Sequence, residues 1–377
     1  METGRYLYCQ YCFRSSQLIR SKSTCLGVGL CIMQCLALAH SQGLRVSFVD
    51  SARLPEPEIT NLEFVDAESG WLRTIANLWR TRDAGQHWTS LPVTSSDSGL
   101  TISYKFRTPQ NGWLLSVSGI LLSHDGGDSW SRLPVPESFQ SGRGELQCAW
   151  FSSDLRIAWV GGGIYERSPG GTLHGPGNAI DIGPDGAVRV LRPAVFRTVN
   201  GGRTWDRQIV ISDEYRVKQL VFLDSQHGCL RTEKSTFWTT SGGKVWARSA
   251  FPRLGTNNDW RFDLDSISAA MIFLNADHGW LVFQNGDIFR TVDGARSWNL
   301  AAQGVGSNDG PAEELQFIST DAGFLRTAQG ALFFTNDGGG SWHPVNVGGH
   351  VWAISGAVNA HSILAAVGDR LRSLEVR

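Results

Sequence analysis

Three aspartates in one polar segment could supply carboxylate chemistry. Asp259, Asp263 and Asp265 lie within RLGTNNDWRFDLDS, residues 253–266. If this segment is a strand, alternation places Asp263 and Asp265 on the same face. Two carboxylates that face each other across a sugar can hydrolyse a glycosidic bond. No G-x-S-x-G, H-E-x-x-H or phosphate-loop motif accompanies them, so the sequence assigns no catalytic residue.

Three arginines occupy one position of a repeated pattern. Arg73, Arg231 and Arg326 follow the triplets GWL, GCL and GFL. A shared register sets their side chains at equivalent heights in their sheets, where guanidinium groups can bind carboxylates or phosphates. We therefore predict that these three bind a partner. The alternative is that each arginine pairs with a carboxylate on a neighbouring strand.

The stretch TNDGGGSWHPV, residues 335–345, could be a metal or phosphate loop, but five related stretches occur elsewhere. Each stretch, called a box here, has Asp, Asn or Ser at its third position and Trp at its eighth: Asp83 and Trp88, Asp125 and Trp130, Asn200 and Trp205, Ser241 and Trp246, Asp293 and Trp298, Asp337 and Trp342. Such repetition indicates a structural turn. The Asp accepts backbone N–H groups, the glycines supply positive φ, and the Trp packs between sheets. No metal or cofactor site is expected.

The spacing between two motifs defines the repeating unit. In five units the second residue of the triplet precedes the box Trp by 17 or 18 residues, and in the third unit by 46. Each unit of about 40 residues has the size of a four-stranded propeller blade. The third unit therefore holds a 29-residue insertion within about 161–193. There Ile180, Ile182, Val188, Val190 and Leu191 could form a small hairpin, either decorative or partner-binding.

The ends of the chain supply one further blade without a box. VWAISGAV, HSILAAVG and RLRSLEV near the C-terminus give three strands, and LRVSFVD at 44–50 gives the fourth. Pairing the two ends removes exposed sheet edges. The sequence thus predicts an all-β fold, a single seven-bladed β-propeller of four-stranded antiparallel blades with box turns, closed by its N- and C-terminal strands. Six or eight blades are the alternatives.

The first 39 residues have the features of a secretory signal peptide. Basic residues precede the apolar run TCLGVGLCIMQCLALA, which is short for a membrane span and ends in Ala-Leu-Ala. Cleavage before His40 leaves the propeller, residues 40–377. The alternative is an uncleaved anchor, which would be the chain's one link to a membrane. The expected location is exported: periplasmic, thylakoid-lumenal or extracellular.

Removal of the leader changes the cysteine count and the charge. Five of the seven cysteines lie in the leader, so disulfides are not expected to be the framework. The remaining chain has 30 Lys and Arg against 34 Asp and Glu, which does not indicate a nucleic-acid partner. We expect a monomer.

The boxes resemble the Asp-box, or neuraminidase-type repeat, of sialidases, sortilin-type receptors, some two-domain glucanases and the photosystem II stability and assembly factor family. The short blades, the D-G-G-x-S/T-W variants and the G-W-L triplets resemble that assembly-factor family most. The resemblance implies an exported, non-catalytic propeller that binds other proteins, including membrane-protein assembly intermediates, through an arginine-rich patch. It also implies that function lies on the face opposite the boxes.

A glycoside hydrolase of the same superfamily, sialidase-like or other, is the alternative. Adjacent Tyr165 and Glu166 resemble the tyrosine–carboxylate pair of a sialidase, but the Phe/Tyr-Arg-Ile-Pro motif is missing, since FPRL at 251–254 has Arg and Pro reversed. Long loops are the expected functional segments. They are the insertion, residues 253–266, and residues 304–314.

Overall fold

The structure is a computed structural model that describes residues 46–93, 101–116, 119–140, 143–167, 180–182, 187–208, 216–232, 235–250, 268–359 and 362–376. The predicted leader lies outside these residues, and so does the segment with Asp259, Asp263 and Asp265. Within the described residues, no helix is long and apolar enough to cross a membrane.

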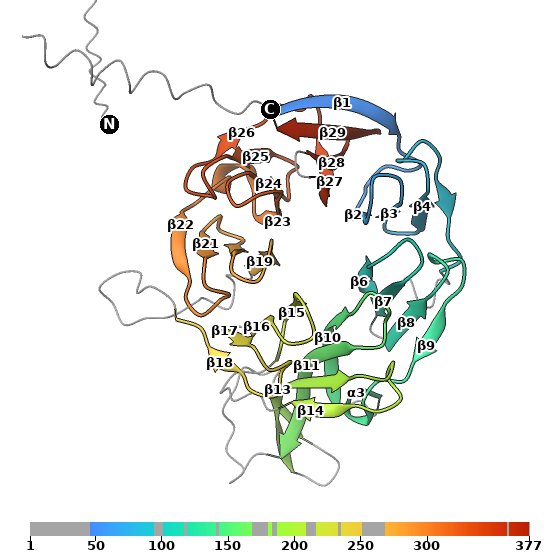
Figure 1. The fold of residues 1–377 in the computed structure, drawn as a ribbon, viewed down its shortest axis with the longest axis vertical. Coiled ribbons are helices and arrows are strands. Elements are labelled where there is room, and N and C mark those ends of the chain that lie inside the picture. The colour runs from blue at the N-terminus through green and yellow to red at the C-terminus, as the bar shows by residue number, and fades with distance from the viewer. Residues whose placement is uncertain are drawn as a thin grey trace, which may run out of the picture. The chain divides into compact units, whose positions relative to one another are not determined.

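Seven antiparallel sheets follow one another around a ring, which confirms the predicted seven-bladed propeller (Figure 1). Blades 1 and 2 are regular four-stranded meanders. Blade 1 holds β2 (Asn61–Phe64), β3 (Gly70–Arg73), β4 (Leu78–Thr81) and β5 (Thr89–Ser90). Blade 2 holds β6 (Thr101–Phe106), β7 (Gly112–Ser116), β8 (Gly119–Ser123) and β9 (Ser131–Leu133).

Blades 4, 5 and 6 repeat the same order. Blade 4 holds β15 (Gln219–Phe222), β16 (Gly228–Arg231), β17 (Thr236–Thr239) and β18 (Ala247–Arg248). Blade 5 holds β19 (Ser268–Phe273), β20 (Gly279–Phe283), β21 (Ile288–Thr291) and β22 (Asn299–Ala302). Blade 6 holds β23 (Ala312–Phe317), β24 (Gly323–Thr327), β25 (Leu332–Thr335) and β26 (His343–Pro344), and a short 3₁₀ turn, η2 (Ser307–Asp309), precedes it.

Blade 7 closes the ring with both ends of the chain, as predicted. It holds β27 (Val351–Asn359), β28 (Ser362–Val367), β29 (Arg370–Val376) and the N-terminal strand β1 (Val46–Arg53). β1 pairs antiparallel with β29, from Val46↔Val376 to Arg53↔Arg370. Because this pairing joins residues at opposite ends of the sequence, it closes the ring within blade 7.

Blade 3 departs from the regular pattern because its second and third strands are long. It holds β10 (Gly144–Phe151), β11 (Ala158–Arg167), β13 (Val188–Thr198) and β14 (Asp206–Gln208), and helix α3 (Glu137–Gln140) precedes it. The additional strand β12 (Ile180–Ile182) pairs with β13 at Ile180↔Val190 and Ile182↔Val188. The predicted small hairpin in the insertion is therefore confirmed.

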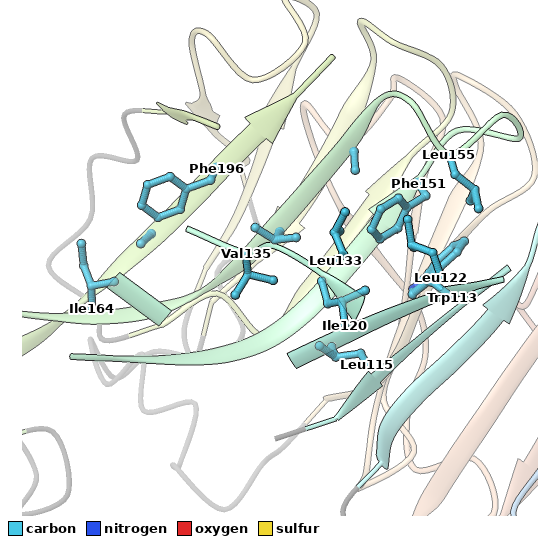
Figure 2. Packing of buried hydrophobic residues seen from close by; sticks show 13 residues of the cluster. Trp113, Leu115, Ile120, Leu122, Leu133, Val135, Phe151, Leu155, Ile164 and Phe196 are labelled. Carbon is cyan, nitrogen blue, oxygen red and sulfur yellow. The ribbon is translucent and has the colours of Figure 1, made fainter. Parts of the chain in front are cut away.

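The hydrophobic core lies between blades. Figure 2 shows one such cluster, in which side chains of blade 2 meet those of blade 3: Trp113, Leu115, Ile120, Leu122 and Leu133 from the former, Phe151, Leu155, Ile164 and Phe196 from the latter. Full burial of one such side chain contributes about 1.5–3 kcal/mol to stability. Each blade is thus stabilised mainly by its neighbours.

The box of blade 6 forms a closed hydrogen-bonded turn between β25 and β26. Thr335 Oγ1 donates to Asp337 Oδ1 (2.8 Å) and accepts from Gly339 N–H (3.0 Å). Asp337 also accepts from Ser341 N–H (2.9 Å) and from the Ser341 hydroxyl (2.6 Å). Gly338 and Gly339 adopt φ of 77° and 98°, which L side chains rarely adopt. These contacts give the Asp a role in holding the turn.

The box Trp packs between blades as predicted, since Trp342 joins a cluster of residues from blades 5 and 6, and the triplet Trp adds an interblade contact that the sequence does not predict. Trp280 of β20 stacks on Phe317 of the next blade, with ring centroids 3.6 Å apart. Its indole N–H donates to the box carbonyl of Gly338 (2.8 Å). Trp342 meets the same Phe317 edge-on at 6.0 Å, within its own blade, and its indole N–H donates to Gly339 O. The triplet residue Trp280 thus joins two blades. The box residue Trp342 packs against the same Phe on which Trp280 stacks.

Candidate functional site

The antiparallel order gives the ring two chemically different faces. The turns between first and second strands and the boxes between third and fourth strands lie on one face, called the box face. The turns between second and third strands and the connections from one blade to the next lie on the other, called the loop face. Only the box face carries the box motif, so we expect partner-specific residues on the loop face.

The three predicted binding arginines all lie near the loop face, in three separate blades. Arg73 and Arg231 end β3 and β16, and Arg326 is the fourth residue of β24. Blades 1, 4 and 6 are not neighbours in a seven-membered ring. The three arginines thus belong to separate blades, and their binding role stays a prediction.

Arg326 is held by groups of the protein itself. Its side chain is 6% exposed and forms ion pairs with Glu314 (2.8 Å) and Glu313 (2.5 Å). Its remaining nitrogen donates to Thr327 O (3.0 Å). Burial raises the pKa of the Glu314 carboxyl, and the positive charge of Arg326 opposes that shift. Because Glu314 also accepts Ile354 N–H of blade 7 (2.9 Å), this cluster connects two blades.

Arg73 and Arg231 are half-buried. Burial lowers the pKa of the Arg73 guanidinium, and the nearby Tyr104 hydroxyl opposes that effect. Arg231 donates to Thr232 O (3.2 Å), as Arg326 donates to Thr327 O. The shared register predicted from the triplets therefore produces a similar backbone contact in blades 4 and 6.

A pocket of about 830 Å³ opens on the loop face between blades 2 and 3. Its lining comes from the end of β9, the connection that carries α3 and the start of β10. The side chains that line it include Arg132, Leu133, Phe139, Gln140, Glu145 and Gln147. The volume falls within the ~300–1,000 Å³ typical of ligand sites.

The connection around α3 shapes this pocket. Phe139 N–H donates to Pro136 O (2.9 Å), and the Gln140 amide contacts the carbonyl of Val135. The Phe139 ring lies edge-on to Phe196 of β13 at 5.6 Å, which fixes the connection against blade 3. Gly144 begins β10 where a side chain would not fit, since a Cβ there would lie 2.8 Å from Gly163 O.

The blade 3 wall carries a charged cluster. The Glu145 carboxylate accepts from Arg216 (2.6 Å) and from the Tyr165 hydroxyl (3.3 Å). Arg132 of β9 also lines the pocket and is exposed. The lining thus carries one positive and one negative side chain, Arg132 and Glu145.

The long hairpin of blade 3 adds further arginines nearby. Arg143 and Arg167 are exposed. In the strand register Arg189 of β13 lies between Arg167 of β11 and Asp181 of β12, so a carboxylate of this chain is directly opposite it.

Tyr165 and Glu166 do not form the sialidase-like pair that their adjacency suggests. The Tyr165 hydroxyl contacts Glu145, whereas Glu166 pairs with Arg207 of β14 (2.6 Å). Successive residues of a strand point to opposite faces, and this strand obeys that rule. The two side chains therefore belong to different surroundings.

The sequence does not reveal the pocket residues, because none of them belongs to a repeated motif. One signal was available in the glycine run 161–163 of β11. A Cβ at Gly162 would lie 1.8 Å from Glu145 O, so the run permits the close approach of β10. Gly162 O also accepts Val217 N–H (2.9 Å), which sets Arg216 beside Glu145.

Metal and thiol chemistry find little support in the described part of the chain. No group of three or more His, Cys, Asp or Glu residues there could hold a metal ion. Cys148 and Cys229 are buried free thiols, and burial raises the pKa of both above its ordinary value. Such thiols are poor nucleophiles.

No protein-family model and no curated protein sequence matches this chain. Solved structures do match it. A structure described as YCF48 bound to D1 peptide is 18% identical with a TM-score of 0.57, and the match covers 88% of this chain and 97% of that one. YCF48 from Cyanidioschyzon merolae is 15% identical with a TM-score of 0.54, covering 87% and 98%.

An enzyme structure is similar to a comparable degree. The GH74 xyloglucanase from Xanthomonas campestris is 12% identical with a TM-score of 0.53, and the match covers 87% of this chain but 53% of the enzyme. At these identities the likeness shows the fold alone. Function must therefore be argued from the residues of this chain.

Proposed function

We propose that this chain is an exported, non-catalytic propeller that binds a segment of another protein on its loop face and acts in assembly or scaffolding. The observation that carries the proposal is the pocket between blades 2 and 3. Its lining combines apolar side chains, such as Leu133 and Phe139, with the charged Arg132 and Glu145. An extended peptide offers apolar and charged groups within a few residues.

The similarity to YCF48 supports the same class of function, since that protein was solved with a D1 peptide. Membrane-protein assembly intermediates are accordingly the first partners to test. If the source organism is photosynthetic, photosystem II assembly becomes the specific expectation. Export rests on the apolar leader of the sequence.

Affinity capture with a charge-reversed pocket tests the proposal. Arg132→Glu should reduce capture of the partner about tenfold or more, because a charge-assisted contact contributes about 1.5–3 kcal/mol. Arg203→Glu is the matched control, because Arg203 is also exposed but lies in the box of blade 3, on the other face. Equal capture by both variants, or no specific partner with the unaltered protein, would contradict the proposal.

The glycoside-hydrolase alternative predicts catalysis and is tested separately. The protein would be incubated with xyloglucan and with fluorogenic sialosides and glucosides. Turnover that disappears in the Asp263→Ala, Asp265→Ala protein would replace the binding proposal by an enzyme.

A further inference from the structure

Three interblade interfaces contain the same aromatic lock. In each, a triplet Trp stacks on a Phe in the first strand of the next blade: Trp71 on Phe106 (3.8 Å), Trp159 on Phe222 (3.7 Å) and Trp280 on Phe317 (3.6 Å). Each indole N–H donates to the carbonyl of the box residue at position four: Gly126 (3.0 Å), Gly242 (3.0 Å) and Gly338 (2.8 Å). The lock therefore needs one flat ring, one Phe face and one carbonyl.

An Arg on the third strand accompanies each of these locks. Arg80, Arg197 and Arg290 lie directly opposite the triplet Trp in the strand register. Arg197 and Arg290 lie over the Trp rings at 5.2 and 5.6 Å, and Arg80 donates to Gly126 O (3.1 Å). The guanidinium group and the box residues therefore both lie next to the indole.

Blade 4 has exchanged these residues. Cys229 occupies the position of the triplet Trp, and Trp238 occupies the position of the Arg, directly opposite it. The cation is supplied instead from blade 5, where Arg296 lies over the Trp238 ring at 4.6 Å. The interface between blades 4 and 5 thus keeps a Trp and an Arg but has no indole in the stacking position.

The partners that would receive an indole are still present on blade 5. Phe273 corresponds to Phe317 and has Trp298 as its edge partner at 6.0 Å, but no ring stacks on it among the described residues. Phe273 is half-buried, whereas Phe106, Phe222 and Phe317 are at most 5% exposed. Gly294 has the box position and the left-handed φ (72°) of Gly338 (77°), so its carbonyl belongs to the same turn.

A cavity of about 110 Å³ lies at this position. Its lining includes Cys229, Phe273, Gly294 and Arg296, and exposed His227 and Asp277 stand at its rim on the box face. This space is smaller than the ~150 Å³ apolar cavity that can bind benzene, so a ring that enters it also extends past the rim. Its exposed rim leaves room for a second ring to extend toward solvent.

We propose that this cavity binds a flat aromatic ligand with a ring N–H, of which indole is the simplest. The ligand ring stacks on Phe273, its N–H donates to Gly294 O, and it replaces the triplet Trp that blade 4 lacks. The site lies on the box face and is independent of the loop-face pocket.

Binding of free indole to the full chain tests this site, with ligand-detected NMR as the measurement. Benzofuran is the matched ligand, because it has the same shape and no N–H. We expect saturable indole binding and a threefold to tenfold weaker affinity for benzofuran, the usual effect of one hydrogen bond. No indole binding at millimolar concentration, or equal affinity for both ligands, would overturn the proposal.

Two variants locate the binding site. Cys229→Trp combined with Trp238→Arg restores the residues of the other locks and should abolish indole binding. Cys229→Ala keeps the cavity and should retain it within about twofold, which shows that the thiol itself is not required. If the Cys229→Trp, Trp238→Arg protein still bound indole with unchanged affinity, the ligand would lie elsewhere and the proposal would fail.

A third ligand identifies the natural source of the ring. N-acetyltryptophanamide carries the same indole on a peptide backbone. Affinity equal to that of indole would assign the site to a Trp side chain of a partner protein. Much weaker affinity would assign it to a free small molecule.

Discussion

The interfaces on the two sides of blade 5 are closed by different means. Between blades 5 and 6, Trp280 fills the gap with a stacked and hydrogen-bonded indole. Between blades 4 and 5, Trp298 is 1% exposed and its indole N–H crosses to Thr236 Oγ1 of blade 4 (3.0 Å). The backbone also crosses there, since Ala250 and Ser297 form a parallel bridge. A propeller can thus lose one Trp lock where a neighbouring Trp and the backbone connect the same two blades.

The largest effect is expected when the interface between blades 5 and 6 loses its stacked indole and so resembles the interface between blades 4 and 5. Trp280→Cys should cost about 3–5 kcal/mol of unfolding free energy, because a fully buried indole is removed and blade 5 has Arg290, not a Trp, directly opposite it. Cys229→Ala is the control and should cost less than about 1 kcal/mol. Denaturant unfolding measures both. Similar losses of unfolding free energy in the two variants would show that the two interfaces do not differ in this way.

The second prediction tests the compensating Trp. Trp298→Phe should cost about 1–2 kcal/mol in addition to the lost ring volume, because Thr236 Oγ1 loses its donor. Trp130→Phe is the matched control, since the buried Trp130 Nε1 has no hydrogen-bond partner in the described structure. Thermal unfolding of the two proteins gives the comparison, and equal shifts would show that the crossing hydrogen bond is unimportant.

The third prediction concerns the addition of an indole at the interface between blades 4 and 5. Cys229→Trp with Trp238→Arg should stabilise the protein by about 0.5–2 kcal/mol, the usual gain from filling a cavity. Each single variant serves as a control, because Cys229→Trp alone places two Trp side chains opposite each other. A destabilised double variant would mean that Gly294 and Phe273 are not arranged to receive an indole.

The smallest effect concerns pH and should be equal at both interfaces. Partial burial raises the pKa of Asp293 and Asp337, but hydrogen bonds from Ser297 and Ser341 outweigh it, so both pKa values lie below the ordinary value. A carboxylate with a lowered folded-state pKa contributes stability that is present above its unfolded pKa of ~3.9 and is lost as pH falls through the folded value.

Asp293→Asn and Asp337→Asn should therefore each weaken the loss of stability as pH falls below about 4, by the same amount. Asn200 shows that the turn accepts an amide, since its Oδ1 accepts Thr204 N–H (3.0 Å). Denaturant midpoints measured across this pH range make the comparison. A clearly larger change for one of the two would place part of the difference between the interfaces in the boxes.

The fold could be predicted from the sequence because its signals are local. Five of the six boxes lie 17 or 18 residues after their triplets, the sixth differs by an insertion, and the unassigned strands at the two ends define the closure. The role of the triplet Trp could not be predicted in the same way. It depends on which Phe of the next blade faces the indole, and spacing along the chain does not report contacts between blades.

The candidate sites depend on such contacts even more strongly. Cys229 is visible as a departure from the triplet pattern, but its exchange with Trp238 requires the strand register. The pocket between blades 2 and 3 depends on the α3 connection, which is not repeated. The common position of Arg326 was predicted, whereas its pairing with Glu313 and Glu314 follows from the path of β23.

Indole complementation of the Trp280→Cys protein shows whether the two interfaces differ by one indole. We expect a fixed concentration of indole to raise the thermal midpoint of this variant more than that of the unaltered protein. The variant then has two sites of the same kind, and ligand binding to the folded state stabilises it at each. An equal rise in both proteins, or none in the variant, would mean that the interfaces do not differ in this way.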